Sequence, residues 1–260
     1  MVVRSIREHA SAHNWFAVAI DLVIVVVGVF IATQVNNWNQ ARIETGQSRS
    51  YRARLIGELD FNARQYRHQI SYYRQVRGHG LAALAALEGR SRPPARDFLI
   101  DAYQFTQVDT GPPKSYIYDE MVSAGMVERL GDDAIEEGAS DYYLTIKANY
   151  DVHNAVFPYR TIIREIIPYA MQEAIRSECG DIFVYYRDRI IGVRLPEDCD
   201  AVIDPAQAEA AARTVQAVPR IGLELTRYLA STDEKLSLLG VNLQLTEDLH
   251  RKLVEVARSD

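Results

Sequence analysis

The stretch WFAVAIDLVIVVVGVFIATQVNNW, from Trp15 to Trp38, decides the architecture of this chain. Asp21 is the only formally charged residue in it. About 20 apolar residues in a helix span the ~30 Å hydrocarbon layer of a bilayer. Aromatic residues such as the two terminal tryptophans are typical of membrane interfaces. We therefore predict a transmembrane helix over 15–38, preceded by an N-terminal flank at 1–14.

A cleaved signal peptide is the alternative interpretation of this stretch, because Arg4 and Arg7 precede it. The apolar run is long for a signal peptide, and it contains an acidic residue. The best exit point, near Ala32, has Phe30 where a small residue is needed. We therefore expect the segment to be retained as an anchor.

One face of the predicted anchor carries small and polar side chains. Helical spacing aligns Asp21 with Gly28, Ala32 and Asn36. A carboxylate about 9 Å inside the bilayer is costly unless it finds a partner, and a small-xxx-small pair lets another backbone approach closely. We predict that this face contacts a second transmembrane helix, from another copy or another subunit. The alternative is that Asp21 only snorkels toward the basic flank.

The composition is that of a folded protein with an uneven charge distribution. Of the 260 residues, 48% are hydrophobic and 25% are charged, which excludes disorder as the main state. Residues 1–78 contain ten arginines and five acidic residues, a net charge of +5, so the remainder of this −6 chain carries −11. An acidic distal part repels phosphate, and we expect no nucleic-acid partner. The lipid bilayer is the expected partner of the basic part.

The rest of the chain indicates a mainly α fold with one small β-hairpin. We predict a juxtamembrane helix over 39–78 and a helical domain over 79–260, with the hairpin at 182–195. Pro168 should kink a helix that begins near Tyr159.

Two segments carry a family resemblance. The anchor ends in VFIATQVNNWN, and 115–143 reads SYIYDEMVSAGMVERLGDDAIEEGASDYY. Both resemble an uncharacterised bacterial family of single-span membrane proteins, a domain of unknown function with an Asn-Asn-Trp-Asn signature after its transmembrane helix. The resemblance covers about the first 150 residues and implies a helical protein of the bacterial inner membrane. It implies no activity.

The two cysteines, Cys179 and Cys199, bracket the predicted hairpin. A disulfide between them would join the ends of the two strands, and such bonds persist in oxidising compartments. Two free thiols are the alternative, whereas a zinc site lacks its other ligands. Flanking arginines slightly favour a cytoplasmic domain, but the cysteines favour a periplasmic one. We expect a cytoplasmic N-terminus and a periplasmic C-terminal domain.

No motif predicts catalytic, cofactor or metal-binding residues. The six histidines are scattered, and the acidic run 132–137 lacks the alternating ligands of a calcium loop. Ser123-Ala124-Gly125 is not a nucleophile elbow. We therefore expect a non-enzymatic interaction or accessory subunit. The alternatives are a ligand-sensing extracytoplasmic domain, which needs a concave pocket among the tyrosine-bearing helices, and a membrane-anchored hydrolase, which needs converging acid and base side chains.

Overall fold

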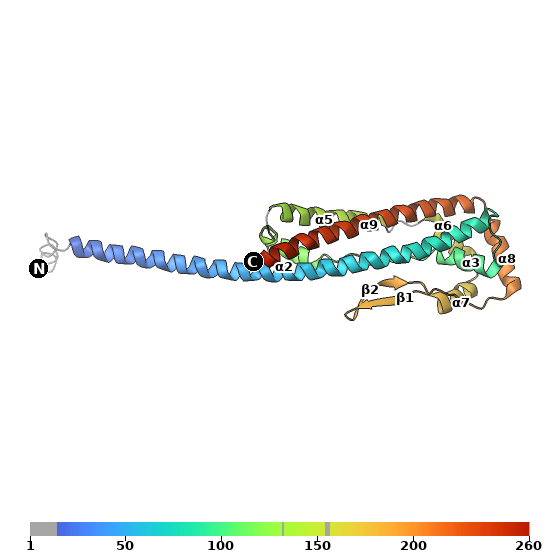
Figure 1. Ribbon diagram of the computed structural model, residues 1–260, viewed down its shortest axis with the longest axis horizontal. Coiled ribbons are helices and arrows are strands. Elements are labelled where there is room, and N and C mark those ends of the chain that lie inside the picture. Colours follow the sequence, from blue (N-terminus) through green and yellow to red (C-terminus); the bar gives the residue numbers. More distant parts are fainter. Residues whose placement is uncertain (1–14, 132, 154–156, 260) are drawn as a thin grey trace, which may run out of the picture. The chain divides into compact units, whose positions relative to one another are not determined.

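The computed structural model describes residues 15–131, 133–153 and 157–259. The described chain is mainly helical with one two-stranded antiparallel sheet, which confirms the predicted fold class (Figure 1). The elements in chain order are α2 (Trp15–Leu87), α3 (Ala95–Gln104), α4 (Tyr116–Ser123), the 3₁₀ turn η1 (Val127–Arg129), α5 (Asp133–His153), α6 (Pro158–Ile166), α7 (Tyr169–Cys179), β1 (Ile182–Tyr186), β2 (Arg189–Arg194), α8 (Pro205–Gln216) and α9 (Ile221–Ser259). The predicted N-terminal flank at 1–14 lies outside the described residues.

The chain forms two compact units that divide between Tyr51 and Arg52, inside α2. In the first unit, α2 is long and apolar enough to cross a membrane, and its most apolar window has no buried residue. Leu22 is 64% exposed and Phe30 is 62% exposed. The apolar side chains of this part of α2 are therefore not covered by other described parts of the chain.

The core of the second unit forms around the C-terminal part of α2. Leu55 and Leu59, one turn apart, are fully buried, as expected for the apolar stripe of an amphipathic helix. Helices α5 and α9 contact each other on one side of α2, and the hairpin lies on the other side (Figure 1). A cluster of aromatic rings joins α6 and the end of α3 to α9: Tyr228 of α9 lies 5.9 Å from Tyr159 of α6 and 4.7 Å from Phe105, between ring centroids.

The hairpin turns at Arg187 and Asp188, which both have positive φ, at 48° and 60°. Positive φ at both central residues is the geometry of the two-residue turns whose twist matches that of paired strands. Tyr186 pairs with Arg189, and the register shifts between Val184 and Tyr185. The expected hairpin therefore forms, within the range predicted for it.

Two helix boundaries differ from those predicted, and one residue typical of helix caps lies inside a helix. Helix α2 continues past residue 78 to Leu87, and Gly80 allows it to lie against the Phe105 ring, 2.7 Å from where a Cβ would stand. The chain does not kink at Pro168 but breaks into two helices, because the residue before a proline is driven to extended backbone. Thr232 lies within α9, where its hydroxyl donates to the carbonyl of Tyr228.

Candidate functional site

A row of buried polar side chains follows one face of α2 through the second unit. Their spacing of three or four residues places them on neighbouring turns of the helix. Each is at most 6% exposed. We call the following residues the polar stripe: Glu58, Asn62, Gln65, Gln69 and Tyr73.

The polar stripe binds the backbone of the loop that leads into α4. Asn62 makes two hydrogen bonds with Lys114: its Nδ2 donates to the carbonyl and its Oδ1 accepts from the N–H, both at 2.8 Å. Gln65 and Gln69 both donate to the carbonyl of Gly111 at 2.9 Å. Because a loop has few backbone partners of its own, these side chains satisfy groups that would otherwise be buried unpaired. They fix the path of the loop.

Gly111 is required where the loop meets the polar stripe. A Cβ at this position would lie 2.8 Å from Gln65 Nε2 and 3.3 Å from Asp109 Oδ1. The N–H of Gly111 also donates to Asp109 Oδ1 at 3.0 Å. The loop can therefore approach α2 this closely only because Gly111 has no side chain.

Glu58 caps α4 from the neighbouring helix. Its Oε2 accepts the N–H of Ile117 at 2.8 Å, and its Oε1 accepts the Tyr143 hydroxyl at 2.6 Å. The Ser115 hydroxyl bonds instead to Asp119, and no side chain of the N-cap residue satisfies the first turn. Burial raises the pKa of Glu58, although both hydrogen bonds oppose that shift. The carboxylate acts as a cap rather than as a group open to solvent.

Asp109 and Lys235 form the most unusual charged group of the second unit. The Tyr73 hydroxyl donates to the Asp109 carbonyl and accepts from its N–H, at 2.9 and 3.0 Å. It also accepts from Lys235 Nζ at 3.3 Å. Burial raises the pKa of the Asp109 carboxyl and lowers the pKa of Lys235 to about 8, while each charge partly offsets the shift of the other. Tyr73 thus links Lys235 to the backbone of Asp109.

Two hollows flank Asp109. One, with a volume of only about 20 Å³, lies among residues of α2, α5 and α9 and is lined in part by Tyr66, Tyr73 and Tyr150. The other, of about 250 Å³, lies between the loop and the hairpin. Lys235 lines neither of them. We therefore assign Lys235 the role of an internal counter-charge to Asp109 rather than that of a reacting amine.

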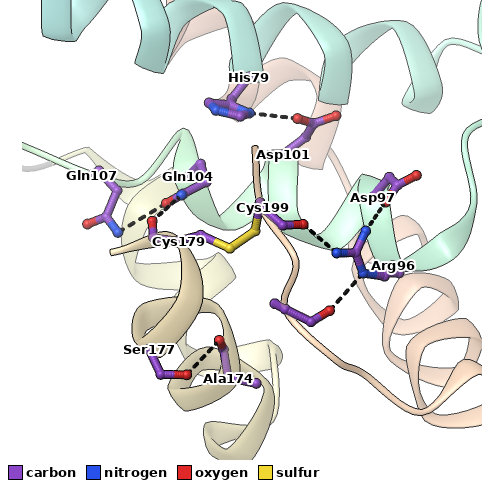
Figure 2. Close-up of a disulfide and its surroundings, with 11 residues drawn as sticks. His79, Arg96, Asp97, Asp101, Gln104, Gln107, Ala174, Ser177, Cys179 and Cys199 are labelled. Atoms are coloured by element: carbon purple, nitrogen blue, oxygen red, sulfur yellow. Dashed lines mark hydrogen bonds and ion pairs between the residues drawn. A yellow bond between two sulfur atoms is a disulfide. The ribbon is translucent and has the colours of Figure 1, made fainter. Parts of the chain in front are cut away.

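The structure brings the two cysteines together, and their sulfur atoms are bonded across a separation of 20 residues (Figure 2). Helix α3 holds both ends of this link. Gln104 Nε2 donates to the carbonyl of Cys179 at 2.6 Å, and the Arg96 guanidinium donates to the carbonyl of Cys199. The disulfide therefore joins the entry to β1 and the exit from β2 beside a fixed helix.

The predicted helix-contact face lies in the first unit. Asp21, Gly28, Ala32 and Asn36 all belong to α2, and all four are exposed. A Cβ added at Gly28 would meet no atom within 4 Å. The contact of this face with another helix stays a prediction.

Sequence reasoning missed Glu58, Asp109 and Lys235. A signal was present for the first, because acidic and amide residues recur at helical spacing beside the apolar stripe of α2. The segment DTGPPK at 109–114 was recognisable only as a loop. Among the residues that the structure describes, no group of three or more His, Cys, Asp or Glu side chains could hold a metal ion.

Comparison of the chain with known protein families, curated proteins and solved structures finds no match.

Proposed function

We propose that this protein is a non-enzymatic interaction or accessory subunit of the bacterial inner membrane, anchored by the apolar part of α2. The observation that carries the proposal is the exposure of that helix, whose most apolar window has no buried residue. An apolar surface of this length is rarely left in water, because its burial in lipid is strongly favourable. A bilayer supplies the apolar environment that the chain itself does not.

The Cys179–Cys199 disulfide supports a periplasmic helical domain. Cytosolic thiols are kept reduced, whereas disulfides form and persist in the periplasm. Short loops translocate according to their basic residues, but large domains cross largely regardless of charge. A cytoplasmic N-terminus and a periplasmic C-terminal domain accord with both rules.

The interaction that we propose within the bilayer uses the face that contains Asp21, Gly28 and Ala32. Gly28 and Ala32 leave room for close approach of a second helix, and a partner would compensate the cost of an intramembrane carboxylate.

Cysteine crosslinking in membranes tests this interaction. Because both native cysteines are bonded, Gly28→Cys introduces a free thiol. Phe30 lies on the opposite side of the helix, two residues or about 200° away, so Phe30→Cys is the matched control. We expect one specific crosslinked species for Gly28→Cys alone. Equal crosslinking at both positions, or none at either, would contradict a specific helix partner.

Ligand sensing is the second candidate function. It is supported by the groove beside Asp109 and by Gln65 Oε1, a buried acceptor with no hydrogen-bond partner among the described residues. A ligand-dependent rise in melting temperature of the full chain, in the absence of a second protein, would distinguish it from the accessory role. Stoichiometric co-purification of another protein in mild detergent would favour the accessory role instead.

A further inference from the structure

The groove between the hairpin and the loop has two chemically different sides. Its volume is about 250 Å³. Phe183 and Ile190, which line one part of it, are both at least half exposed. Gln65, Asp109 and Asp181 line another part. The groove therefore combines an apolar wall with a wall of oxygen-bearing side chains.

One of these oxygens, Gln65 Oε1, is an acceptor without a donor among the described residues. Gln65 is only 6% exposed. Its Nε2 donates to the carbonyls of Gly111 and Pro112, at 2.9 and 3.2 Å. A flipped amide would direct oxygen at those carbonyl oxygens, so this orientation is fixed. The Asp109 carboxylate accepts the N–H of Gly111 at 3.0 Å, and the Gln69 amide and the N–H of Val193 also lower its pKa through hydrogen bonding.

The groove is also negatively charged. Asp181 accepts the Tyr72 hydroxyl at 3.0 Å and shares the groove with Asp109. Burial raises the pKa of both carboxyls, and the charge of Asp109 adds to the shift of Asp181. Lys235 faces Asp109 and Arg164 faces Asp181. No cation of the described chain lies within 4 Å of either carboxylate.

The lining of the groove indicates which chemical class of ligand it can bind. An unpartnered amide oxygen beside two carboxylates matches a cation that donates hydrogen bonds. A hard metal ion is a poor match, because it prefers a shell of oxygen ligands to an apolar wall. A primary ammonium on an aliphatic chain presents three N–H donors at one end and apolar surface along the rest.

We propose that the groove binds a primary alkylammonium ligand. Its ammonium donates to Gln65 Oε1 and to the carboxylates of Asp109 and Asp181, and its chain lies against Phe183 and Ile190. This inference rests on the second candidate function and names its ligand class. It is independent of the membrane anchor, which carbonate extraction tests separately.

Calorimetric titration of the full chain in mild detergent with hexylammonium tests the proposal. We expect saturable binding and a higher melting temperature. Hexanol, which lacks the charge, and ammonium chloride, which lacks the chain, should each bind at least about tenfold more weakly. Absence of saturable hexylammonium binding, or equal binding of hexanol, would overturn the proposal.

Variants locate the site. Asp109→Asn keeps an acceptor for the N–H of Gly111 and should weaken hexylammonium binding about tenfold or more, as should Asp181→Asn. Asp200→Asn removes the same charge from an exposed position outside the groove and should leave binding unchanged. Circular dichroism verifies that each variant is folded. Because two groove variants are measured, the test remains decisive if one of them fails to fold. Equal affinities for all three variants would overturn the assignment.

Discussion

The hydrogen bond between Tyr143 and Glu58 should be one of the strongest single contacts in the second unit. The hydroxyl lies 2.6 Å from Oε1, Glu58 is 2% exposed, and Tyr143 is 6% exposed. A hydrogen bond to a buried charged group contributes about 1.5–3 kcal/mol. Tyr143→Phe keeps the ring, which stacks on Tyr118 at a centroid distance of 4.1 Å, and removes only the hydroxyl. We therefore expect it to destabilise the domain by about 2 kcal/mol.

Glu58→Ala should cost more than Tyr143→Phe. It leaves two donors unpartnered, the Tyr143 hydroxyl and the N–H of Ile117. An unsatisfied buried polar group costs about 1–3 kcal/mol, so we expect a loss of about 4 kcal/mol. In a double-mutant cycle the two changes should be coupled by at least about 1.5 kcal/mol.

Urea unfolding of the full chain in mild detergent, followed by circular dichroism, measures these free energies. Tyr169→Phe is the matched control, because Tyr169 is 70% exposed and its loss of a hydroxyl should change stability by less than about 0.5 kcal/mol. If Tyr143→Phe proved as mild as the control, or if the two changes were additive, the cap by Glu58 would be refuted.

Glu58 should also make the stability of the domain depend on pH in a defined direction. Burial raises the pKa of Glu58 above its ordinary value of 4.5, so the folded state binds the proton more tightly than the unfolded state. The contribution of Glu58 to stability is therefore fully present below pH 4.5 and is lost as the pH rises through the folded pKa. Glu58→Gln should lack this component. If the free energy of unfolding of the wild type instead rose relative to that of Glu58→Gln as the pH increases above 4.5, the raised pKa of Glu58 would be contradicted.

Three further outcomes are expected. Replacing both Cys179 and Cys199 by serine should cost about 3 kcal/mol, the chain-entropy value for a separation of 20 residues, measured by urea unfolding; no change would contradict a formed disulfide. Lys235 has its pKa lowered from 10.5 to about 8, so the wild type should gain stability relative to Lys235→Met between pH 8 and 10.5, by up to about 3 kcal/mol. If the difference in unfolding free energy between the wild type and Lys235→Met did not change between pH 8 and 10.5, the lowered pKa of Lys235 would be contradicted. Gly80→Ala should lower stability by about 1–3 kcal/mol, because its Cβ would lie 2.7 Å from the Phe105 ring. A melting temperature equal to that of the wild type would contradict the tight contact.

The parts of the fold that depend on local sequence could be predicted. An uninterrupted apolar run indicates a long helix whatever surrounds it, and β-branched and aromatic residues flanking Arg187-Asp188 indicate a hairpin. The two cysteines could be paired because they are the only two in the chain. These inferences need no knowledge of distant contacts.

The candidate site depends on contacts that sequence spacing does not reveal. Glu58 caps a helix that begins 58 residues later, and Lys235 reaches Tyr73 across 162 positions. Thr232 illustrates the same limit, because a residue type typical of helix N-caps lies inside α9 and bonds to the preceding turn. Local chemistry predicts which residues can cap or pair, whereas tertiary packing decides which of them do.

Alkaline carbonate extraction of membranes that contain the full chain tests the membrane anchor most directly. We predict that the protein stays in the membrane pellet, because the exposed apolar side chains of α2, such as Leu22, Val26 and Phe30, lie in lipid. A variant with Val26→Lys and Phe30→Lys, which places two charges at the bilayer centre, should be released. Release of the unaltered protein into the supernatant would contradict the account.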